Sequence, residues 1–320
     1  MAATSLRVDL HGHAFPGRYC AFLDDLVGAA SPVPDWSVAA QLEMMDSRGI
    51  HAAVLSLPPP GVFFGDLALA GRLAREVNDD IAALVAEHPA RFGGLAALPL
   101  PDVEASLAEI GHAFDELGLD GVALLTNVGG TYVGDPAFDP VFDELDRRGA
   151  YVFLHPQVPP YAAPLGQFPV WLAEFPFETT RAAINLIYSG TLERCGRLRL
   201  QLAHLGGAAP FLAGRIASLA EREPRLACKA PRGARAYLSD LYYDTGLSNS
   251  AEGLAAIKEV TEIEHVVFGT DWPYAALPDG DPAPALDMFG APTRRRIESA
   301  HAQALVPRLT AKLARTEHDN

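Results

Sequence analysis

Short hydrophobic runs alternate along the chain with longer stretches in which apolar residues recur every three or four positions. Glycine, proline or polar residues flank the short runs, which is typical of strands that are buried on both faces. The predicted strands are Leu6–Leu10, Ala52–Leu57, Phe92–Ala97, Gly121–Leu125, Tyr151–Leu154, Leu198–Ala203, Leu241–Tyr243 and His265–Phe268. The longer stretches predict helices over Val38–Arg48, Leu69–Glu87, Ala105–Leu117, Phe142–Arg148, Glu178–Tyr188, Phe211–Glu221 and Ala251–Val260.

This alternation favours an α/β fold, a (β/α)8 TIM barrel, formed as a single domain by residues 1–320. Parallel strands need crossover helices, and closing the sheet removes both of its edges. An open, doubly wound sheet is the structural alternative. Proline-rich stretches at Pro58–Pro60, 156–169 and 272–284 follow the second, fifth and eighth strands and predict small insertions in the rim loops. The polar tail from about Ala311 is expected to be poorly ordered.

Composition and charge narrow the class of protein. The chain has 320 residues, of which 49% are hydrophobic and 20% charged, as in an ordinary globular protein. The chain has 25 lysine and arginine residues and 40 aspartate and glutamate residues. The resulting net charge of −15 disfavours nucleic acid and anionic membrane surfaces as partners. We find no membrane-spanning apolar run and no signal-peptide core at the start. Cys20, Cys195 and Cys228 suit neither a disulfide framework nor a cysteine-based zinc site, so we expect a cytoplasmic protein.

The first candidate chemistry lies at the end of the first predicted strand, in Val8-Asp-Leu-His11-Gly-His13. Residues at i and i+2 of a strand point to the same side of the sheet. At the mouth of a barrel that side is the interior, so both imidazoles can reach one cation. A His-X-His pair alone fits a polar strand end or a turn equally well.

Three more predicted strands end in an imidazole or a carboxylate, namely at His155, His204 and Asp271. Catalytic groups of TIM barrels come from the ends of several strands, and these side chains are ligands preferred by Zn²⁺ and also by Mn²⁺ or Fe²⁺. Barrel hydrolases with two metals often take a modified lysine from the end of strand four. Here that end is Leu124-Leu-Thr-Asn127 without a lysine nearby, so one metal ion per chain is predicted.

Taken together, these motifs resemble the amidohydrolase superfamily, in the branch that contains aminocarboxymuconate semialdehyde decarboxylase and γ-resorcylate decarboxylase. The resemblance extends from residue 9 to about residue 273. It is carried by Asp9-Leu-His11-Gly-His13, Met45-Asp-Ser-Arg-Gly49-Ile, Phe153-Leu-His155-Pro156, Ala203-His204-Leu-Gly-Gly207, Gly214-Arg215-Ile216 and Gly269-Thr-Asp271-Trp-Pro273.

The resemblance implies a mononuclear divalent site, usually zinc with manganese as the alternative, whose ligands match His11, His13, His155 and Asp271. It implies that His204 transfers protons. It further implies that Arg215 is donated across a homodimer interface to the substrate carboxylate, although helix arginines more often make surface salt bridges. From its place beside the metal, Asp271 is expected to alternate between ligand and acid.

Other residues near the predicted rim are candidates for substrate binding. Phe168 and Trp272 would form an apolar wall against an aromatic substrate, and Asn127 follows strand four. Loop packing is the alternative for the two aromatic residues, and capping a turn is the alternative for Asn127. Asp244 follows strand seven, where it would either orient a metal-bound imidazole or cap a turn.

Three functions remain open at this point. The leading one is a non-oxidative decarboxylase acting on a small unsaturated or aromatic carboxylic acid, and the alternative is a hydrolase of a lactone, amide or carbon–carbon bond at the same site. A catalytically silent barrel would be expected to have lost ligands, and this ligand set is intact. The decarboxylases carry an arginine where this chain has Val38-Ala-Ala-Gln-Leu-Glu43, so their substrates are not transferred to it.

Overall fold

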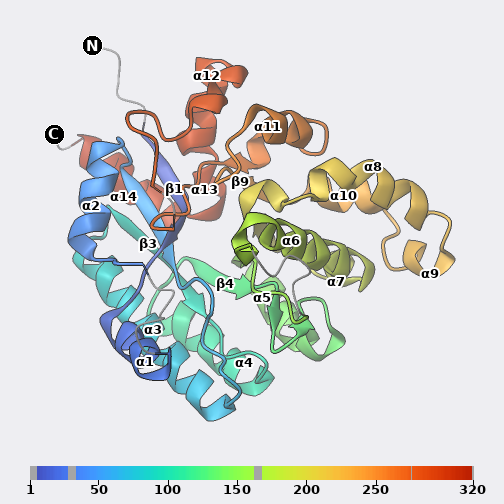
Figure 1. The fold of residues 1–320 in the computed structure, drawn as a ribbon, viewed down its shortest axis with the longest axis horizontal. Helices are drawn as coiled ribbons and strands as arrows, with labels where there is room; N and C mark the ends of the chain where they lie inside the picture. Colours follow the sequence, from blue (N-terminus) through green and yellow to red (C-terminus); the bar gives the residue numbers. More distant parts are fainter. Residues whose placement is uncertain (1–5, 28–33, 162–167, 275, 319–320) are drawn as a thin grey trace.

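The computed structural model describes residues 6–27, 34–161, 168–274 and 276–318, and its centre is a parallel eight-stranded sheet surrounded by helices (Figure 1). The strands follow one another in the order β1-β2-β3-β4-β7-β8-β9-β10. Their bounds are β1 Val8–His13, β2 Ala52–Ser56, β3 Phe92–Ala97, β4 Gly121–Leu125, β7 Tyr151–His155, β8 Arg199–Leu202, β9 Tyr242–Asp244 and β10 Val266–Val267.

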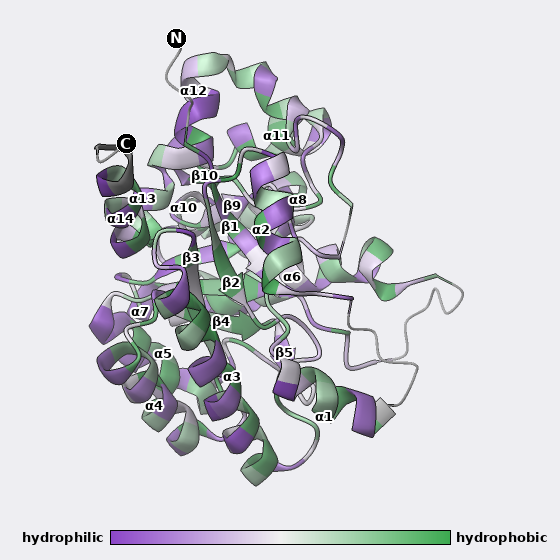
Figure 2. Cartoon of the chain, turned by 90° about the vertical axis from the view of Figure 1, so that its left-hand side faces the viewer, coloured by the Kyte–Doolittle hydropathy of each residue, from purple (hydrophilic) through white to green (hydrophobic). Residues whose placement is uncertain are grey.

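The sheet is nearly closed, because the segment after β10 returns to β1. The amide of Leu10 donates to the carbonyl of Phe268 at 2.9 Å, and the amide of His13 donates to the carbonyl of Trp272 at 3.1 Å. The predicted (β/α)8 barrel is therefore confirmed, and the open sheet is excluded. Figure 2 shows that hydrophobic residues concentrate in the strands, while the outer helices carry most of the hydrophilic ones.

The helices begin and end close to where the sequence predicts, and several short ones join them. The α-helices are α1 Gly17–Val27, α2 Val38–Ser47, α3 Leu67–Glu87, α4 Val103–Gly111, α5 Asp139–Arg148, α6 Val170–Tyr188, α7 Thr191–Arg194, α8 Ala209–Ala220, α9 Pro224–Ala227, α10 Ala234–Ser239, α11 Ala251–Lys258, α12 Ala291–Arg295, α13 Ala302–Leu305 and α14 Pro307–His318. Polar caps fix the long helices, as where the Asp66 side chain accepts from the amide of Leu69 at the start of α3. None of the helices in the described ranges has the length and apolar character that crossing a membrane requires.

Two rim-loop insertions follow strands for which the proline-rich stretches predicted none. After β4 the chain forms an antiparallel hairpin of β5 (Asn127–Val128) and β6 (Thr131–Tyr132). Helix α1 follows β1 on the same rim. These insertions place extra side chains around the mouth of the barrel.

Helix α6 begins at Val170, two turns before the predicted start at Glu178. The earlier start places Pro176, which lacks an amide hydrogen, inside the helix. The helix tolerates the lost hydrogen bond because Glu174, Glu178 and Ala182 share one buried face across the proline. Tertiary packing thus outweighs the local cost of the proline.

The tail from about Ala311 lies in a helix, since α14 continues through Ala311 to His318. Leu309 and Leu313 of this helix belong to a buried cluster with Val8 and Val267 at the floor of the barrel. Arg308 adds an ion pair with Asp120 at 2.5 Å. Two leucines four residues apart in α14 thus close the barrel from below, and residues 319 and 320 lie outside the described ranges.

Candidate metal centre

Strand β1 supplies two buried histidines to the mouth of the barrel. Asp9, His11 and His13 alternate with apolar residues or glycine along the strand, and all three are buried. The register against β2 shifts between Asp9 and Gly12, which marks a bulge. The two imidazoles thus lie inside β1, with ring centroids 5.0 Å apart, rather than beyond the end of the predicted strand.

Asp271 lies opposite β1 in a backbone conformation that few non-glycine residues adopt, with φ at 62°. Its amide donates to the carbonyl of His11 at 2.7 Å. The preceding residue, Thr270, donates from its amide and its hydroxyl to the Asp9 carboxylate, at 3.0 and 2.6 Å. These bonds hold the strained segment, so the Asp271 carboxylate is fixed in place before any ligand arrives.

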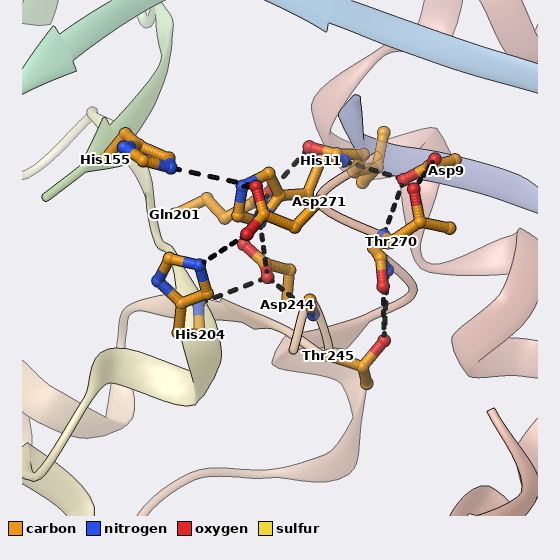
Figure 3. Close-up of polar contacts among 12 residues, drawn as sticks. Asp9, His11, His155, Gln201, His204, Asp244, Thr245, Thr270 and Asp271 are labelled. Carbon is orange, nitrogen blue, oxygen red and sulfur yellow. Dashed lines mark hydrogen bonds and ion pairs between the residues drawn. The ribbon is translucent and has the colours of Figure 1, made fainter. Parts of the chain in front are cut away.

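Four imidazoles surround this carboxylate, three of them visible with it in Figure 3. Oδ1 of Asp271 lies 3.1 Å from Nε2 of His11, 2.8 Å from Nε2 of His13 and 3.9 Å from Nε2 of His155. Oδ2 lies 3.1 Å from Nε2 of His204. The residues predicted from four strand ends therefore converge on one point.

The donor set fits a divalent cation. One ligand atom from each of His11, His155, His204 and Asp271 lies within 4.8 Å of the others, and Nε2 of His11 and of His155 is buried without a hydrogen bond. Buried polar atoms normally find a partner, so these nitrogens are accounted for if they bind a metal ion. Imidazole nitrogen and carboxylate oxygen suit zinc and manganese.

The electrostatics of the centre favour a bound cation. Burial lowers the pKa of His155 to about 3 and also lowers that of His13, so both imidazoles are neutral, as metal ligands must be. Burial alone would lower the pKa of His11, but the carboxylates of Asp244 and Asp271 outweigh it and raise that pKa to about 10. The surrounding imidazoles hold the pKa of Asp271 well below its usual range against the effect of burial.

The geometry does not separate His13 from His204. His204 belongs to the closest group of four, whereas His13 reaches Asp271 at 2.8 Å and also contacts Ser56 Oγ through Nδ1 at 3.2 Å. The division into the ligands His11, His13, His155 and Asp271 with a proton-transferring His204 therefore stays a prediction.

Comparison with known proteins agrees with this centre. A family model described as amidohydrolase matches residues 8–308, almost the whole chain. The chain belongs to the amidohydrolase family.

Relatives of this amidohydrolase cover most of its length. It is 32% identical to 6-methylsalicylic acid decarboxylase of Aspergillus aculeatus, over 95% of this chain and 100% of that one. It is also 32% identical to 2-amino-3-carboxymuconate-6-semialdehyde decarboxylase of Dictyostelium discoideum, over 83% of this chain and 76% of that one. The γ-resorcylate decarboxylase of a Rhizobium is 30% identical over 73% and 76% of the two chains. The resemblance inferred from the motifs is confirmed.

Solved structures share the fold. A crystal structure named amidohydrolase II has a TM-score of 0.85 and 28% identity, over 94% of this chain and 99% of that one. Dihydroxybenzoic acid decarboxylase from a Polaromonas, crystallised with manganese and the inhibitor 2-nitroresorcinol, has a TM-score of 0.82 and 25% identity, over 95% and 97%.

The predicted substrate-binding residues of the amidohydrolase are dispersed. Trp272 adjoins Asp271 and is partly buried, whereas Phe168 is 57% exposed just before α6. Asn127 is buried, but its amide donates to the carboxylate of Glu178 at 3.1 Å and to the carbonyl of Val158 at 3.2 Å, so it holds the β5–β6 hairpin. Arg215 is exposed on α8, and its guanidinium makes no hydrogen bond or ion pair within the described part of the chain.

The structure adds two aromatic residues at the centre that the sequence argument did not single out. The ring of Tyr274 lies 5.5 Å from that of His13, and the ring of Phe175 lies 6.2 Å from that of His155. Tyr274 follows Asp271 by three residues, which could have indicated it. Phe175 could not be placed because it precedes the predicted start of its helix.

Proposed function

We propose that this amidohydrolase is a metal-dependent, non-oxidative decarboxylase of a small aromatic carboxylic acid. The observation that carries the proposal is the buried convergence of four histidines on Asp271 in a chain aligned end to end with 6-methylsalicylic acid decarboxylase. Aromatic rings beside the imidazoles, from Phe175 and Tyr274, would suit a flat substrate.

The proposed cofactor is one Zn²⁺ ion per chain, held by His11, His13, His155 and Asp271, with Mn²⁺ as the alternative. Manganese is supported by the Polaromonas relative, and zinc by the imidazole-rich donor set. When bound, the cation polarises oxygen atoms of the substrate and stabilises negative charge near the carboxylate.

The protein's own side chains move the proton. Asp271, whose pKa the surrounding imidazoles keep low, would take a proton from His204 across their 3.1 Å hydrogen bond and pass it to the ring carbon that bears the carboxylate. A carbon–hydrogen bond forms, the carbon–carbon bond to the carboxylate breaks, and its electron pair restores the aromatic ring as CO₂ leaves. His204 then takes up a proton from water, so that one carboxylate and one proton become the arene and CO₂. No oxidant is consumed.

Substrate orientation is assigned to Trp272, Phe168, Asn127 and Arg215. Trp272 borders the centre directly, and Asn127 would act by fixing the rim hairpin beside it. Arg215 is proposed to act from a second subunit, which is supported by the lack of any partner within the described residues of its own chain.

A homodimer is proposed on the same face. Helix α6 exposes Trp171, Leu172 and Phe177, and α8 exposes 84% of Phe211. Neighbouring exposed apolar side chains of this size mark an interaction surface.

A cytoplasmic location is also proposed. Cys20, Cys195 and Cys228 are all free in the structure, which supports this location.

Replacing Arg215 by alanine should raise KM at least about tenfold without dissociating the dimer, because a charge-assisted bond to the carboxylate is lost. Steady-state kinetics and light scattering measure both effects, with exposed Arg222→Ala as the matched control. Mixing Arg215→Ala with the inactive His204→Ala subunits should form sites with the wild-type KM, which neither variant has alone. Normal kinetics of Arg215→Ala would exclude the clamp.

Removing the metal should abolish decarboxylation and lower Tm, because a ligand that binds only the folded state stabilises it by about 2.7 kcal/mol at roughly 100 times its Kd. Chelated and metal-loaded protein would be compared on 6-methylsalicylate, 2,6-dihydroxybenzoate, an aryl ester and a lactone. Metal-dependent loss of the aromatic acids supports the proposal. Turnover of the ester or lactone alone would make the protein a hydrolase.

A further inference from the structure

Asp244, at the end of β9, lies fully buried beneath the metal centre and accepts four hydrogen bonds (Figure 3). Its Oδ1 contacts Nδ1 of His11 at 2.9 Å, the amide of Gly246 at 2.9 Å and the amide of His204 at 3.2 Å. Its Oδ2 accepts from Nε2 of Gln201 at 2.8 Å. One carboxylate therefore joins a predicted metal ligand to the predicted proton-transfer residue.

The direction of these bonds is set from the barrel floor. The hydroxyl of Tyr151 donates to Oε1 of Gln201 at 2.8 Å, so the Gln201 amide nitrogen points to Asp244 and to the carbonyl of Leu10. Burial keeps the pKa of Tyr151 well above its usual range, so its hydroxyl remains a donor. Asp244 receives hydrogens from every side, and an ionised carboxylate can only accept them.

This polarity determines the state of His11. Because Oδ1 of Asp244 has no hydrogen to give, Nδ1 of His11 must carry the proton that joins them. A histidine that binds a metal carries one ring proton, so with Nδ1 protonated the lone pair for the cation is on Nε2, which lies 3.1 Å from Asp271 and makes no hydrogen bond.

The same carboxylate steadies the segment that carries His204. His204 and Leu205 are consecutive non-glycine residues with positive φ, at 58° and 52°. Such a backbone is costly and persists only where its surroundings hold it. The bond from the His204 amide to Asp244 is one of these restraints.

Two glycines allow His11 and Asp244 to pack closely against each other. A β-carbon at Gly246 would lie 2.6 Å from Nδ1 of His11 and 3.0 Å from Oδ1 of Asp244. A β-carbon at Gly269 would lie 2.7 Å from Cβ of His11 and 3.0 Å from Cβ of Asp244. Neither position could carry a side chain without separating the two residues.

We propose that Asp244, oriented by Gln201 and Tyr151, is a positioning residue that fixes the tautomer of His11 for metal binding and the backbone of His204 for proton transfer. It touches neither substrate nor metal and acts through the two histidines. The proposal rests on the proposed metal site but not on the identity of the acid that is decarboxylated.

The test compares Asp244→Asn and Tyr151→Phe with wild type, using Asp120→Asn as the control for removing a buried carboxylate away from the centre. Chelator competition measures the Kd for Zn²⁺ and for Mn²⁺, and ¹⁵N NMR of the metal-loaded protein reports which ring nitrogen of His11 carries hydrogen. We expect about 10- to 100-fold weaker metal binding in Asp244→Asn, as for other partners of metal-bound histidines. Tyr151→Phe, which frees the Gln201 amide to turn over, should weaken binding in the same direction by less, and Asp120→Asn should leave it unchanged.

Two outcomes would overturn the proposal. The first is that Asp244→Asn folds, binds the metal with wild-type affinity and keeps the His11 tautomer unchanged. The second applies if Asp244→Asn does not fold, and it is wild-type metal affinity in Tyr151→Phe. Failure of the proposed reaction is a separate result, since it would appear as an absence of decarboxylation in wild-type protein that still binds the metal.

Discussion

Asp271→Asn should lower turnover by about 10³-fold or more and weaken metal binding as well, because the substitution removes a ligand charge and an acid together. The carboxylate lies within 3.1 Å of a nitrogen in each of His11, His13 and His204, so no neighbouring group can replace it. Turnover and metal content per chain measure the two losses.

The matched control for this variant is again Asp120→Asn, whose carboxylate pairs with Arg308 at the barrel floor. It should lose some stability and keep its turnover when folded. Turnover of Asp271→Asn within tenfold of wild type would show that Asp271 is neither the acid nor an essential ligand.

His204→Ala should keep one metal ion per chain and lose about 10²- to 10⁴-fold in turnover, the usual contribution of a positioned acid–base group. His13→Ala should instead lose the metal. Metal analysis of the two variants separates the roles that the geometry leaves equivalent, and His112→Ala, whose ring pairs with Asp79 away from the centre, is the control.

The opposite pattern would reverse the assignment. If His204→Ala loses the metal and His13→Ala retains it, the ligand set is His11, His155, His204 and Asp271, the group whose atoms lie closest together. The proton-transfer role would then have to pass to another residue.

The barrel and the centre were predictable for the same physical reason. Strands buried on both faces leave short apolar runs, and the functional groups of a barrel stand where those runs end. His155 and Asp271 are therefore visible in the sequence as polar residues after apolar strands. His11 and His13 are visible as a pair with the two-residue period of a strand.

Features that depend on long-range packing could not be predicted. The early start of α6 depends on buried residues on both sides of Pro176, and the packing of α14 depends on leucines that close the barrel floor. Gln201 and Tyr151 lie inside strands and share a hydrogen bond across 50 residues of sequence, which no local pattern indicates. The proposed role of Arg215 depends on a second subunit, which the sequence of one chain does not show.

The most direct test of the central claim is to incubate the metal-loaded protein in D₂O with 6-methylsalicylate labelled with ¹³C in its carboxyl group, and in parallel with 2,6-dihydroxybenzoate labelled in the same way. The account predicts, with at least one of them, one equivalent of ¹³CO₂ and a phenol carrying a single deuterium at the carbon that bore the carboxylate, without oxygen uptake and only when metal is present. Retention of the label in both acids by a metal-loaded protein that hydrolyses esters or lactones would contradict it.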